Sequence, residues 1–410
     1  MGKLTIRDID VSGKRVLVRV DFNVPIDEKT GAITDDSRIR ATLPTIKYLI
    51  DRGARVILAS HLGRPDGKVV DKLRLTVVVQ RLSQILGKQV GVTKSCIGSE
   101  TEKSVAGLQS GDVLLLENLR FHSAEERDSP IFARALARLA DIYVNDAFGT
   151  SHRSHASIVR VTEYLPSVAG LLLEKELETL GSILENPAHP FGGLVGGAKV
   201  SDKVGMLENI IGKMDFLLIG GGMAATFLKA KSYEVGLSLI EADRLDTAAG
   251  LMEKAARNGA RLLLPVDVVV VDEISAEAKG KVVSIESISP RQRIVDIGQQ
   301  TIKNFYEELR RCQTVFWNGP MGICEIAQFA EGTRAMAKLL ANLKATTIIG
   351  GGSTAEVVTN MGLADKMSFV STGGGASLRF LGGQILPGVE ALLDKDALAE
   401  RKLKGLAPAR

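Results

Sequence analysis

The sequence predicts an α/β fold with two doubly wound parallel-sheet domains, which an interdomain helix joins and a cleft separates. The length of 410 residues is too great for one ordinary core and suits two domains of typical size. Apolar runs of strand length recur between helical patterns in two successive series. The composition, 45% hydrophobic but only 4% aromatic, is typical of parallel sheets rich in Val, Leu and Ile.

The first series of strands lies in an expected N-terminal domain, residues 1–167. Its apolar runs are RVLVRV from residue 15, RVILAS from 55, VLLLENL from 113 and IYVNDAF from 142. Helical patterns separate these runs, and a helical crossover between neighbouring strands makes the strands parallel. We therefore expect one parallel sheet in this domain.

The second series lies in an expected C-terminal domain, residues 168–387. Its runs are GLVGG from residue 193, DFLLIGG from 215, RLLLPVDVVVV from 261, TVFWNG from 314, TTIIGGG from 346 and SFVSTGGG from 368. Most of these runs end in glycine, whereas those of the first series lead into charged and amide side chains. We expect a second parallel sheet with a different chemistry at its carboxyl edge.

A pattern at helical spacing lies between the two series. It consists of Val168, Leu171, Leu172, Leu180, Ile183 and Leu184. The pattern begins after Pro166 and ends before Pro187, so we expect one interdomain helix that serves as a hinge. Residues 388–410 predict an amphipathic C-terminal helix, and the pattern leaves open which half of the protein it packs on.

Charge and cysteine content argue against several classes of protein. With 52 basic and 48 acidic residues, the net charge of +4 is unlike that of a nucleic-acid-binding tail or a membrane-surface patch. The longest apolar stretch, 262–271, contains Pro265 and Asp267 and is too short to span a bilayer. The three cysteines lack CxxC spacing. We expect a cytoplasmic protein that binds neither nucleic acid nor membranes.

Polar side chains gather where the strands of the first half end. In an open parallel sheet, ligands bind beyond the carboxyl ends of the strands. Seven residues lie at these ends or in an adjoining loop: Asp21, Asn23, Arg38, His61, Arg64, Arg120 and Arg153. Guanidinium groups bind carboxylate and phosphate oxygens in pairs, so the set predicts a site for a small polyanion. Any one of these arginines, taken alone, is more typical of a solvated surface.

The glycine turns of the second half predict a phosphate site. GGGMAA (220–225) and GGGSTA (350–355) each precede an expected helix, whose N-terminal amides can face phosphates. Lys199 and Lys203 are four residues apart, so a helix beginning there would place both on one face. The turns also fit a loose GxGxxA pattern with Glu241 near the distance of a ribose ligand, so a nicotinamide cofactor is an alternative. Some of the turns are compatible with tight turns that only start helices.

Taken in order, the motifs resemble those of the phosphoglycerate kinase family. They are RVDFNVP, SHLGRPDG, LLENLRF, NDAFGTSHRSHAS, GGAKVSDK, GGGMAATFLKA, LPVDVVV, VFWNGPMG, GGGSTAEVV and STGGGASLRFLGG. So many long motifs, in order and nearly end to end, are highly specific. The resemblance implies a monomeric cytoplasmic enzyme of glycolysis, which passes a phosphoryl group between 1,3-bisphosphoglycerate and ADP to give 3-phosphoglycerate and ATP.

The resemblance also implies roles for individual residues. It assigns the triose acid to the N-terminal domain and to Asp21, Asn23, Arg38, His61, Arg64, Arg120 and Arg153. It assigns the magnesium nucleotide to the C-terminal domain and to Lys199, Lys203, Gly221, Gly222, Asn318, Glu325, Gly351, Gly352, Ser353 and Thr354. Glu325 would be the ribose ligand, and the C-terminal helix would pack on the N-terminal domain.

The chemistry expected of such an enzyme needs no general base. The nucleophile is the carboxylate of the substrate, which is already ionised at neutral pH. Catalysis then depends on positioning and on stabilising the charge of the transferred group, which we assign to Arg38, Lys203, magnesium and the amides of Gly374 and Gly375. Transfer between domains also requires the cleft to close about its hinge.

One position departs from the family pattern at the expected metal site. Where the family usually has aspartate after two glycines, this sequence has Ser353. The resemblance assigns that missing carboxylate to magnesium. Because magnesium keeps several waters and binds substrate phosphates, the serine hydroxyl or a water held by it would suffice. The departure makes a noncatalytic binding protein of the same fold an alternative, which an assay with ATP, magnesium and 3-phosphoglycerate would distinguish.

Overall fold

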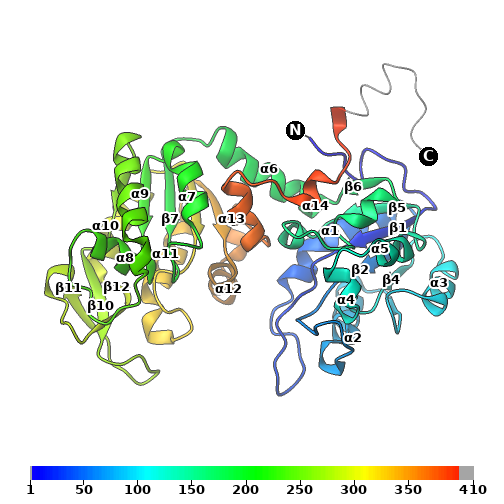
Figure 1. The fold of residues 1–410 in the computed structure, drawn as a ribbon, viewed down its shortest axis with the longest axis horizontal. Helices are drawn as coiled ribbons and strands as arrows, with labels where there is room; N and C mark the ends of the chain where they lie inside the picture. Colours follow the sequence, from blue (N-terminus) through cyan, green and yellow to red (C-terminus); the bar gives the residue numbers. More distant parts are fainter. Residues whose placement is uncertain (1, 397–410) are drawn as a thin grey trace. The chain divides into compact units, whose positions relative to one another are not determined.

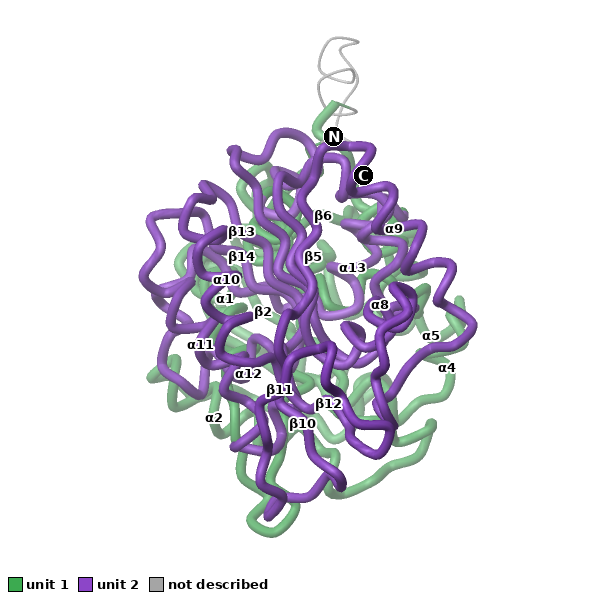
Figure 2. The backbone as a smooth tube through the Cα atoms, turned by 90° about the vertical axis from the view of Figure 1, so that its left-hand side faces the viewer, with its two compact units in different colours: residues 1–178, 385–410 green, residues 179–384 purple. Residues whose placement is uncertain are grey.

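A computed structural model of the chain describes residues 2–396 and divides into two compact units. Unit 1 comprises residues 1–178 with 385–410, and unit 2 comprises residues 179–384 (Figure 2). The boundary lies inside helix α6 (Leu171–Glu185), whereas the sequence analysis placed it at 167/168. The first turn of α6 is bound to unit 1, because Asp146 Oδ1 accepts hydrogen bonds from the amides of Leu172 at 2.9 Å and Leu173 at 3.2 Å.

Unit 1 contains a sheet of six parallel strands in the order β3-β4-β2-β1-β5-β6 (Figure 1). The strands are β1 (Arg15–Arg19), β2 (Arg55–Ala59), β3 (Gly91–Val92), β4 (Val113–Leu115), β5 (Ile142–Asn145) and β6 (Ser167–Ala169). The apolar runs identified in the sequence form β1, β2, β4 and β5, and the predicted parallel sheet is confirmed. Strands β3 and β6 are too short to leave a sequence pattern.

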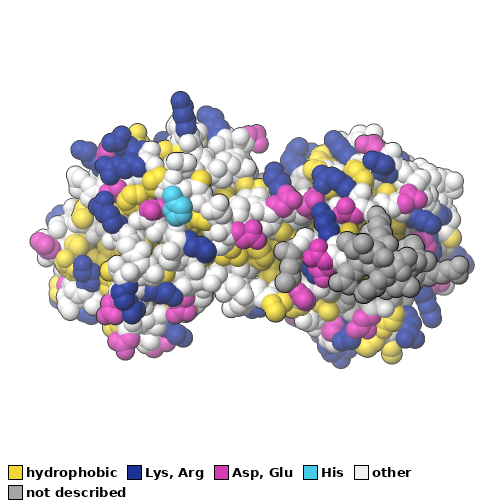
Figure 3. Space-filling model, turned by 90° about the horizontal axis from the view of Figure 1, so that it is seen from above, with side chains coloured by type: hydrophobic (Ala, Val, Ile, Leu, Met, Phe, Trp, Pro, Cys, Tyr) yellow, Lys and Arg dark blue, Asp and Glu magenta, His cyan; other side chains and the backbone are white. Residues whose placement is uncertain are grey.

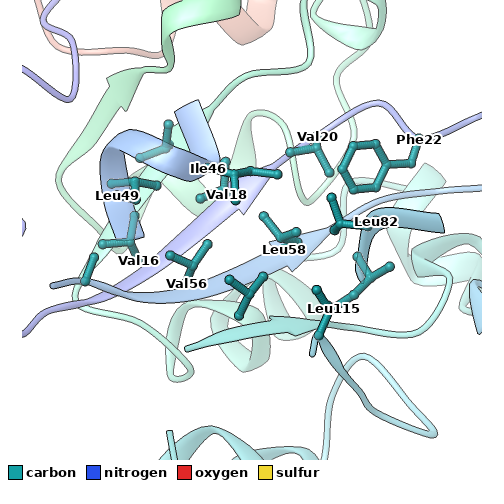
Figure 4. Packing of buried hydrophobic residues seen from close by; sticks show 14 of the residues in the cluster. Val16, Val18, Val20, Phe22, Ile46, Leu49, Val56, Leu58, Leu82 and Leu115 are labelled. Carbon is teal, nitrogen blue, oxygen red and sulfur yellow. The ribbon is translucent and has the colours of Figure 1, made fainter. Parts of the chain in front are cut away.

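Apolar side chains cover both faces of this sheet. Val16 and Val18 of β1 point to one face, where Ile46 and Leu49 of α1 (Ser37–Asp51) pack on them (Figure 4). Leu17 points to the opposite face and is also buried. A strand buried on both sides reads as a continuous apolar run, which is why RVLVRV was recognisable. Each such buried Val or Leu contributes about 1.5–3 kcal/mol relative to an exposed one.

The remaining helices of unit 1 connect its strands. They are α2 (Thr76–Leu86), α3 (Ser99–Ala106), α4 (Ser123–Glu126) and α5 (Pro130–Ala137), with the short 3-10 helix η2 (Leu119–Phe121) after β4. Helix α2 is capped by Gly87, whose φ of 62° is the left-handed conformation that favours glycine. Helix α5 begins with Pro130, which lacks only an amide that the first turn would leave unbonded.

Unit 2 repeats the architecture with a second sheet of six parallel strands, in the order β15-β14-β13-β7-β8-β9. The strands are β7 (Phe191–Val195), β8 (Phe216–Ile219), β9 (Arg261–Leu263), β13 (Thr314–Asn318), β14 (Thr346–Gly350) and β15 (Phe369–Val370). Its helices are α7 (Val204–Ile210), α8 (Met223–Ala230), α9 (Leu245–Arg257), α10 (Gln299–Leu309), α11 (Glu331–Leu340), α12 (Gly352–Asn360) and α13 (Gly375–Leu381).

Unit 2 also has a three-stranded antiparallel sheet that the sequence analysis did not predict. It consists of β10 (Asp267–Val271), β11 (Lys281–Ser284) and β12 (Arg293–Ile297), in the order β11-β10-β12. The run RLLLPVDVVVV, taken as one strand, is two: β9 ends before Pro265, and β10 begins after it in the other sheet. Proline cannot donate to a strand ladder, so the division falls there.

The interdomain helix begins later than its apolar pattern suggested. Val168 lies in β6 rather than in the helix, because residues 167–169 pair with β5 and the amide of Tyr143 donates to the carbonyl of Pro166 at 2.9 Å. Helix α6 therefore starts at Leu171. The remaining positions of the pattern lie within it.

The described part of the C-terminal tail packs on unit 1. Helix α14 (Pro387–Glu390) follows Leu386, and the amide of Gly388 donates to the carbonyl of Ser151 at 2.8 Å. Beyond α14, Lys3 and Asp394 form an ion pair at 2.7 Å. The single helix expected over 388–410 is therefore not continuous, because α14 ends at Glu390 and residues 391–394 are not helical. The part of the prediction that concerns residues 397–410 lies outside the described residues.

The surface of both units mixes the two signs of charge. Basic and acidic side chains are interspersed on the face that Figure 3 shows. Within residues 2–396, no helix combines the length and the apolar character needed to cross a membrane.

Candidate active site

The predicted anion-site residues of unit 1 follow neighbouring strands of its sheet. Asp21 and Asn23 follow β1, His61 follows β2, and Arg120 lies in η2 after β4. In the strand order, β2 lies next to β1 on one side and β5 lies next to it on the other, so the chain order reverses between β1 and β5. This point is a topological switch point of the sheet. Ligands of open parallel sheets bind at such points.

Asp21, Arg38 and His61 form an ionic cluster at this edge. The Arg38 guanidinium pairs directly with the Asp21 carboxylate, and His61 Nδ1 lies 3.9 Å from Asp21 Oδ1. Burial alone would raise the pKa of Asp21, but the charges of Arg38 and Arg19 and the hydrogen bond from the amide of Asn23 lower it. Asp21 is therefore ionised and holds Arg38 at the edge of the sheet.

His61 is neutral, and one of its ring nitrogens is free to donate. Burial lowers the pKa of His61 well below its usual range, and Arg19 and Arg120 lower it further against the opposing charge of Asp21. Arg19 lies 3.3 Å from His61 Nδ1 through a terminal nitrogen, and because a guanidinium only donates, Nδ1 is the acceptor. The proton therefore lies on Nε2, which makes His61 a hydrogen-bond donor through that atom.

Arg120 and Arg64 add positive charge to the same edge of the sheet. Arg120 is 5% exposed and donates from a terminal nitrogen to the carbonyl of Gly63 at 2.8 Å. Burial lowers the pKa of Arg120, and the nearby charges of Arg153 and Arg19 lower it further, whereas Glu126 raises it. Asn23 Oδ1 accepts a hydrogen bond from the amide of Gly63 at 2.9 Å. Arg64, in the same loop, is exposed.

A buried network beneath the edge was missed by the sequence analysis. Arg19, the last residue of β1, is 1% exposed and donates through Nε to Ser157 Oγ at 2.9 Å. Ser157 in turn donates to the buried Glu125 carboxylate, from its hydroxyl at 2.5 Å and from its amide at 2.9 Å. The arginine within RVDFN was a visible signal, but nothing in the sequence links Glu125 to it.

The lysine and asparagine predicted in unit 2 meet at the switch point of its sheet. The chain passes from β7 to β8 on one side and returns to β13 on the other. Lys203, in the loop after β7, donates through Nζ to Oδ1 of Asn318, the last residue of β13, at 2.7 Å. Burial lowers the pKa of Lys203, against the opposing charge of Asp202. The amide nitrogen of the same side chain, Asn318 Nδ2, is buried and has no hydrogen-bond partner within residues 2–396.

Close packing of backbone explains several of the glycines. At Gly221, whose φ is 65°, a Cβ atom would lie 2.5 Å from the amide nitrogen of Gly197 and 2.6 Å from the carbonyl of Pro320. The Gly221 amide donates to the carbonyl of Met321 at 2.9 Å. Gly222 precedes α8, whose first amide, that of Met223, donates to the carbonyl of Gly197 at 2.9 Å. These glycines let three loops approach one another.

Two other glycine turns have open space in front of them. Gly351, with φ of 88°, precedes α12, and Gly352 and Ser353 form its exposed first turn. Thr354 is buried and accepts a hydrogen bond from the amide of Gly319 at 2.9 Å. Gly374 likewise precedes α13, and a Cβ atom at Gly352, Gly374 or Gly375 would meet nothing within 4 Å. The first amides of a helix have no partner within it, so both turns present free donors.

Lys199 and Lys203 do not lie on one helical face, as their spacing had suggested. Helix α7 begins at Val204, after both lysines. Instead, the Glu241 carboxylate accepts hydrogen bonds from the amides of Val200 at 2.6 Å and Ser201 at 3.1 Å, which holds the loop in turns. This use of the carboxylate removes the argument for Glu241 as a ribose ligand of a nicotinamide cofactor. Glu325, after β13, is exposed.

The described residues contain no cluster suited to bind a metal through protein groups alone. Within residues 2–396, no three His, Cys, Asp or Glu side chains come together in such an arrangement. Ser353 is exposed at the first turn of α12. Any divalent cation at this turn would therefore take most of its ligands from a phosphate and from water.

The fold and the two sites define a class of protein. Two parallel α/β units, one with clustered arginines and one with lysines and free helix amides, are suited to phosphoryl transfer. The family model described as "Phosphoglycerate kinase" matches residues 6–384. The chain therefore belongs to the phosphoglycerate kinase family.

Individual relatives agree with the family model. The chain is 55% identical to a phosphoglycerate kinase of Roseiflexus sp. strain RS-1, an alignment that covers 96% of this chain and 100% of the relative. It is 52% identical to that of Moorella thermoacetica, with the same coverage. The solved structure of the Coxiella burnetii enzyme is 42% identical, with a TM-score of 0.83 and coverage of 95% of this chain and 98% of that one. A structure from Pyrococcus horikoshii is 31% identical, with a TM-score of 0.84 and the same coverage.

The activity follows from the family. The chain is a phosphotransferase with a carboxyl group as acceptor, and it transfers a phosphoryl group between 1,3-bisphosphoglycerate and ADP in glycolysis. Its substrates are a nucleotide and a phosphoglycerate.

Proposed function

We propose that unit 1 binds 3-phosphoglycerate or its acyl phosphate, and that unit 2 binds the nucleotide. The observation that carries the proposal is that the cations Arg38 and Arg120 and the neutral donor His61 gather at the switch point of unit 1, where the two arginines both act on the buried His61. Repulsion among close cations is relieved by a bound anion, so the site favours a ligand with several negative charges. The acid-binding residues are Asp21, Asn23, Arg38, His61, Arg64, Arg120 and Arg153.

Each residue contributes in a way that its surroundings support. Arg38, oriented by Asp21, and the Nε2 hydrogen of His61 would donate to the acid. Arg120 and Arg153, whose charges act on each other, would add charge-assisted donors. Arg64 would reach the ligand from its exposed loop. Asp21 and Asn23 act differently: one orients Arg38, and the other holds Gly63 in the loop of Arg64.

In unit 2 the nucleotide would bind along the carboxyl edge of the second sheet. The proposed residues are Lys199, Lys203, Gly221, Gly222, Asn318, Glu325, Gly351, Gly352, Ser353 and Thr354. Lys203 and the free amides of the α12 turn suit the phosphates, since both are donors and the helix terminus carries partial positive charge. Gly221 and Gly222 would contribute by letting the loops after β7, β8 and β13 approach one another, since the Gly221 amide already donates to the carbonyl of Met321. The exposed Glu325 carboxylate suits ribose hydroxyls.

The reaction needs positioning rather than proton removal. The carboxylate of 3-phosphoglycerate is ionised at neutral pH and attacks the terminal phosphorus atom of ATP directly, while the bond from that phosphorus to the bridging oxygen breaks and ADP leaves. Arg38, Lys203 and the amides of Gly374 and Gly375 would stabilise the negative charge on the transferred oxygens. Because the acid and the nucleotide bind different units, we propose that α6 acts as the hinge that lets them meet.

We also propose magnesium as the metal that accompanies the nucleotide. The open turn at Ser353, with no carboxylate in that position, fits a cation bound chiefly by phosphate and water. When bound, magnesium would neutralise part of the phosphate charge. The remaining properties that we propose, a monomeric state and a cytoplasmic location, rest on the resemblance and on the cysteine content.

Two experiments test the proposal. An assay coupled to ATP consumption, with magnesium and 3-phosphoglycerate, tests the reaction. The site assignment is tested by NMR of the histidine side chains. Adding 3-phosphoglycerate alone should shift the His61 signals, whereas adding ADP with magnesium should leave them in place. Unchanged His61 signals at saturating 3-phosphoglycerate would refute the assignment to unit 1.

A further inference from the structure

The loop between β7 and α7 carries both lysines that we propose for the phosphates. The hydrogen bonds of a helix or a strand do not hold this loop. Residues 196–203 lie between Val195 and the start of α7 at Val204. Lys199 is exposed within this loop, and Lys203 is buried at its end. The precise placement of both amino groups therefore depends on what holds the loop backbone.

Glu241 supplies three hydrogen bonds to this loop from a distant part of the chain. Glu241 Oε2 accepts from the amides of Val200 at 2.6 Å and Ser201 at 3.1 Å, and Oε1 accepts from Ser201 Oγ at 2.5 Å. The residue is itself fixed, because its amide donates to Oγ1 of the buried Thr226 in α8 at 3.1 Å. A carboxylate with several charged hydrogen bonds to one loop is among the stronger polar contacts that a protein makes.

The hydrogen bonds continue from the Glu241 contact to Lys203. The carbonyl of Val200 accepts from the amides of Lys203 at 2.9 Å and Val204 at 3.0 Å, so the residue bound by Glu241 also starts α7. Lys203 then reaches Asn318 Oδ1 through its Nζ atom. Any shift of residues 200–201 is therefore transmitted to the Lys203 side chain.

Electrostatics are consistent with this arrangement. Partial burial would raise the pKa of Glu241, but the hydrogen bonds from Ser201 and Val200 and the charge of Lys199 outweigh it and lower the pKa. The carboxylate is therefore ionised at neutral pH. Its charge acts on that of the nearby Lys199 and balances part of it.

We propose that Glu241 is a positioning residue for nucleotide binding. It fixes the loop of residues 196–203 so that Lys199 and Lys203 face the phosphates. The inference rests on the proposed role of these lysines in unit 2. Glu241 does not contact the nucleotide in this account and acts only through the loop. Its loss should therefore weaken nucleotide binding without changing the affinity for 3-phosphoglycerate.

The test compares Glu241→Ala and Ser201→Ala with a matched control. We expect Glu241→Ala to raise the dissociation constant of ADP with magnesium about tenfold by calorimetry, and the KM for ATP in parallel. Ser201→Ala, which removes one of the three bonds, should raise both about threefold. The KM for 3-phosphoglycerate should stay within about twofold in each variant. Combining the two substitutions should add nothing to Glu241→Ala, because the Ser201 bond is already absent.

Glu234→Ala is the control. Its carboxylate also accepts two backbone amides in unit 2, those of Val235 at 2.9 Å and Gly236 at 2.8 Å, but it does not bond the lysine loop. A lower melting temperature for Glu241→Ala with unchanged ADP affinity, or an equal loss of affinity in Glu234→Ala, would overturn the inference. If Glu241→Ala does not fold, Ser201→Ala decides the question in the same way.

Lys203→Ala separates this inference from the proposed function. If Lys203→Ala weakens ADP binding and Glu241→Ala does not, the positioning role is wrong and the lysine assignment stands. If Lys203→Ala leaves both ADP affinity and turnover unchanged, the assignment of the lysine itself is overturned.

Discussion

The two units use the same kind of sheet to build two different kinds of anion site. In unit 1 the donors at the switch point are side chains, Arg38, His61 and Arg120; Asp21 holds the first in place and Arg19 the second. In unit 2 the donors are Lys203 and the free amides of the α12 and α13 turns. The comparison shows that a side-chain site depends on a supporting network, whereas a backbone site depends on close approach of loops and on open space at glycine.

The difference also concerns what each site can recognise. Guanidinium and imidazole groups fixed by Asp21 and Arg19 have defined directions, which suits a small acid with one carboxylate and one phosphate. Helix amides and an ammonium group bind any suitably placed phosphate oxygen. The following substitutions test this contrast, beginning with the largest expected effect.

Lys203→Ala should cause the largest loss of activity. The ammonium group is one of the two lysine donors proposed for the nucleotide phosphates, and removal of such a donor to the transition state typically costs about 3–4 kcal/mol, or several hundredfold in kcat. Steady-state kinetics in the coupled assay would measure it. Lys338→Ala, an exposed lysine on α11, is the control and should stay within about twofold. A loss of less than about tenfold in Lys203→Ala would remove the distinction between lysine and backbone donors.

Arg38→Ala should lower kcat/KM for 3-phosphoglycerate about a hundredfold, because it removes a donor and leaves the buried Asp21 without its partner. The KM for ATP should not change. Arg40→Ala is a matched control, since Arg40 lies on the same helix and pairs with Asp36 at 2.8 Å. An equal rise in the KM values for 3-phosphoglycerate and ATP would mean that unit 1 is not specific for the acid.

Gly352→Ala tests whether phosphates approach the α12 turn. Its Cβ would meet no protein atom within 4 Å, so folding should be unaffected or slightly improved. A bound phosphate would meet the added methyl group, and we expect ADP affinity to fall about tenfold by calorimetry. Gly250→Ala in α9, also with open space around it, should leave the affinity unchanged. Wild-type affinity in Gly352→Ala would place the phosphates elsewhere.

Ser353→Asp should reduce the magnesium concentration needed for half-maximal rate by a few-fold, because a carboxylate is a better magnesium ligand than a hydroxyl. A magnesium titration at fixed ATP would measure the change. In Ser353→Asn, the asparagine side chain has the size of aspartate but no charge. This control should shift the titration much less. If the aspartate variant and the parent titrate alike, the cation does not lie at this turn.

His155→Gln should make unit 1 less sensitive to acid. Burial, together with the charges of Arg19, Arg120 and Arg153, lowers the pKa of His155 to about 4. A histidine whose pKa is lower in the folded state contributes stability above its unfolded pKa of about 6.5, and this stability is lost as the pH falls toward 4. Partial solvent screening reduces the effect, so we expect the variant to lose about 1 kcal/mol less than the parent between pH 7 and pH 5.

The measurement for this variant must report on unit 1 alone. Hydrogen exchange of peptides from β1 and β5, as a function of denaturant, gives the free energy of unfolding of that unit at each pH. His189→Gln in unit 2, where His189 is paired with Asp215 at 2.6 Å, is the control. Identical acid sensitivity of His155→Gln and the parent would contradict the account.

The parts of the fold that were predictable are those with a local cause. Strands buried on both faces give apolar runs, so β1, β2, β4 and β5 were recognised. Pro265 was visible but was read as an interruption rather than as the boundary between two sheets. Strand β11 is mostly exposed and carries no apolar alternation, so its antiparallel sheet had no clear signal.

The parts of the site that escaped prediction depend on contacts between distant residues. His61 and Arg120 follow strand ends, as the sequence predicted. Arg38, which was expected in a loop, lies in the first turn of α1, and Lys203, which was expected on a helix, lies in the loop before α7. The support of Arg19 by Ser157 and Glu125 and the support of the lysine loop by Glu241 join segments far apart in the chain. For the same reason, helical spacing was the wrong model for Lys199 and Lys203.

The division of ligands between the units is tested most directly by hydrogen exchange with one ligand present at a time. With 3-phosphoglycerate alone, we predict slower exchange in peptides that contain residues 19–23, 61–64 and 118–121, with no change in unit 2. With ADP and magnesium alone, we predict slower exchange in residues 196–203 and 350–356, with no change in unit 1. Protection of residues 196–203 by 3-phosphoglycerate alone, or of residues 61–64 by the nucleotide alone, would contradict the account.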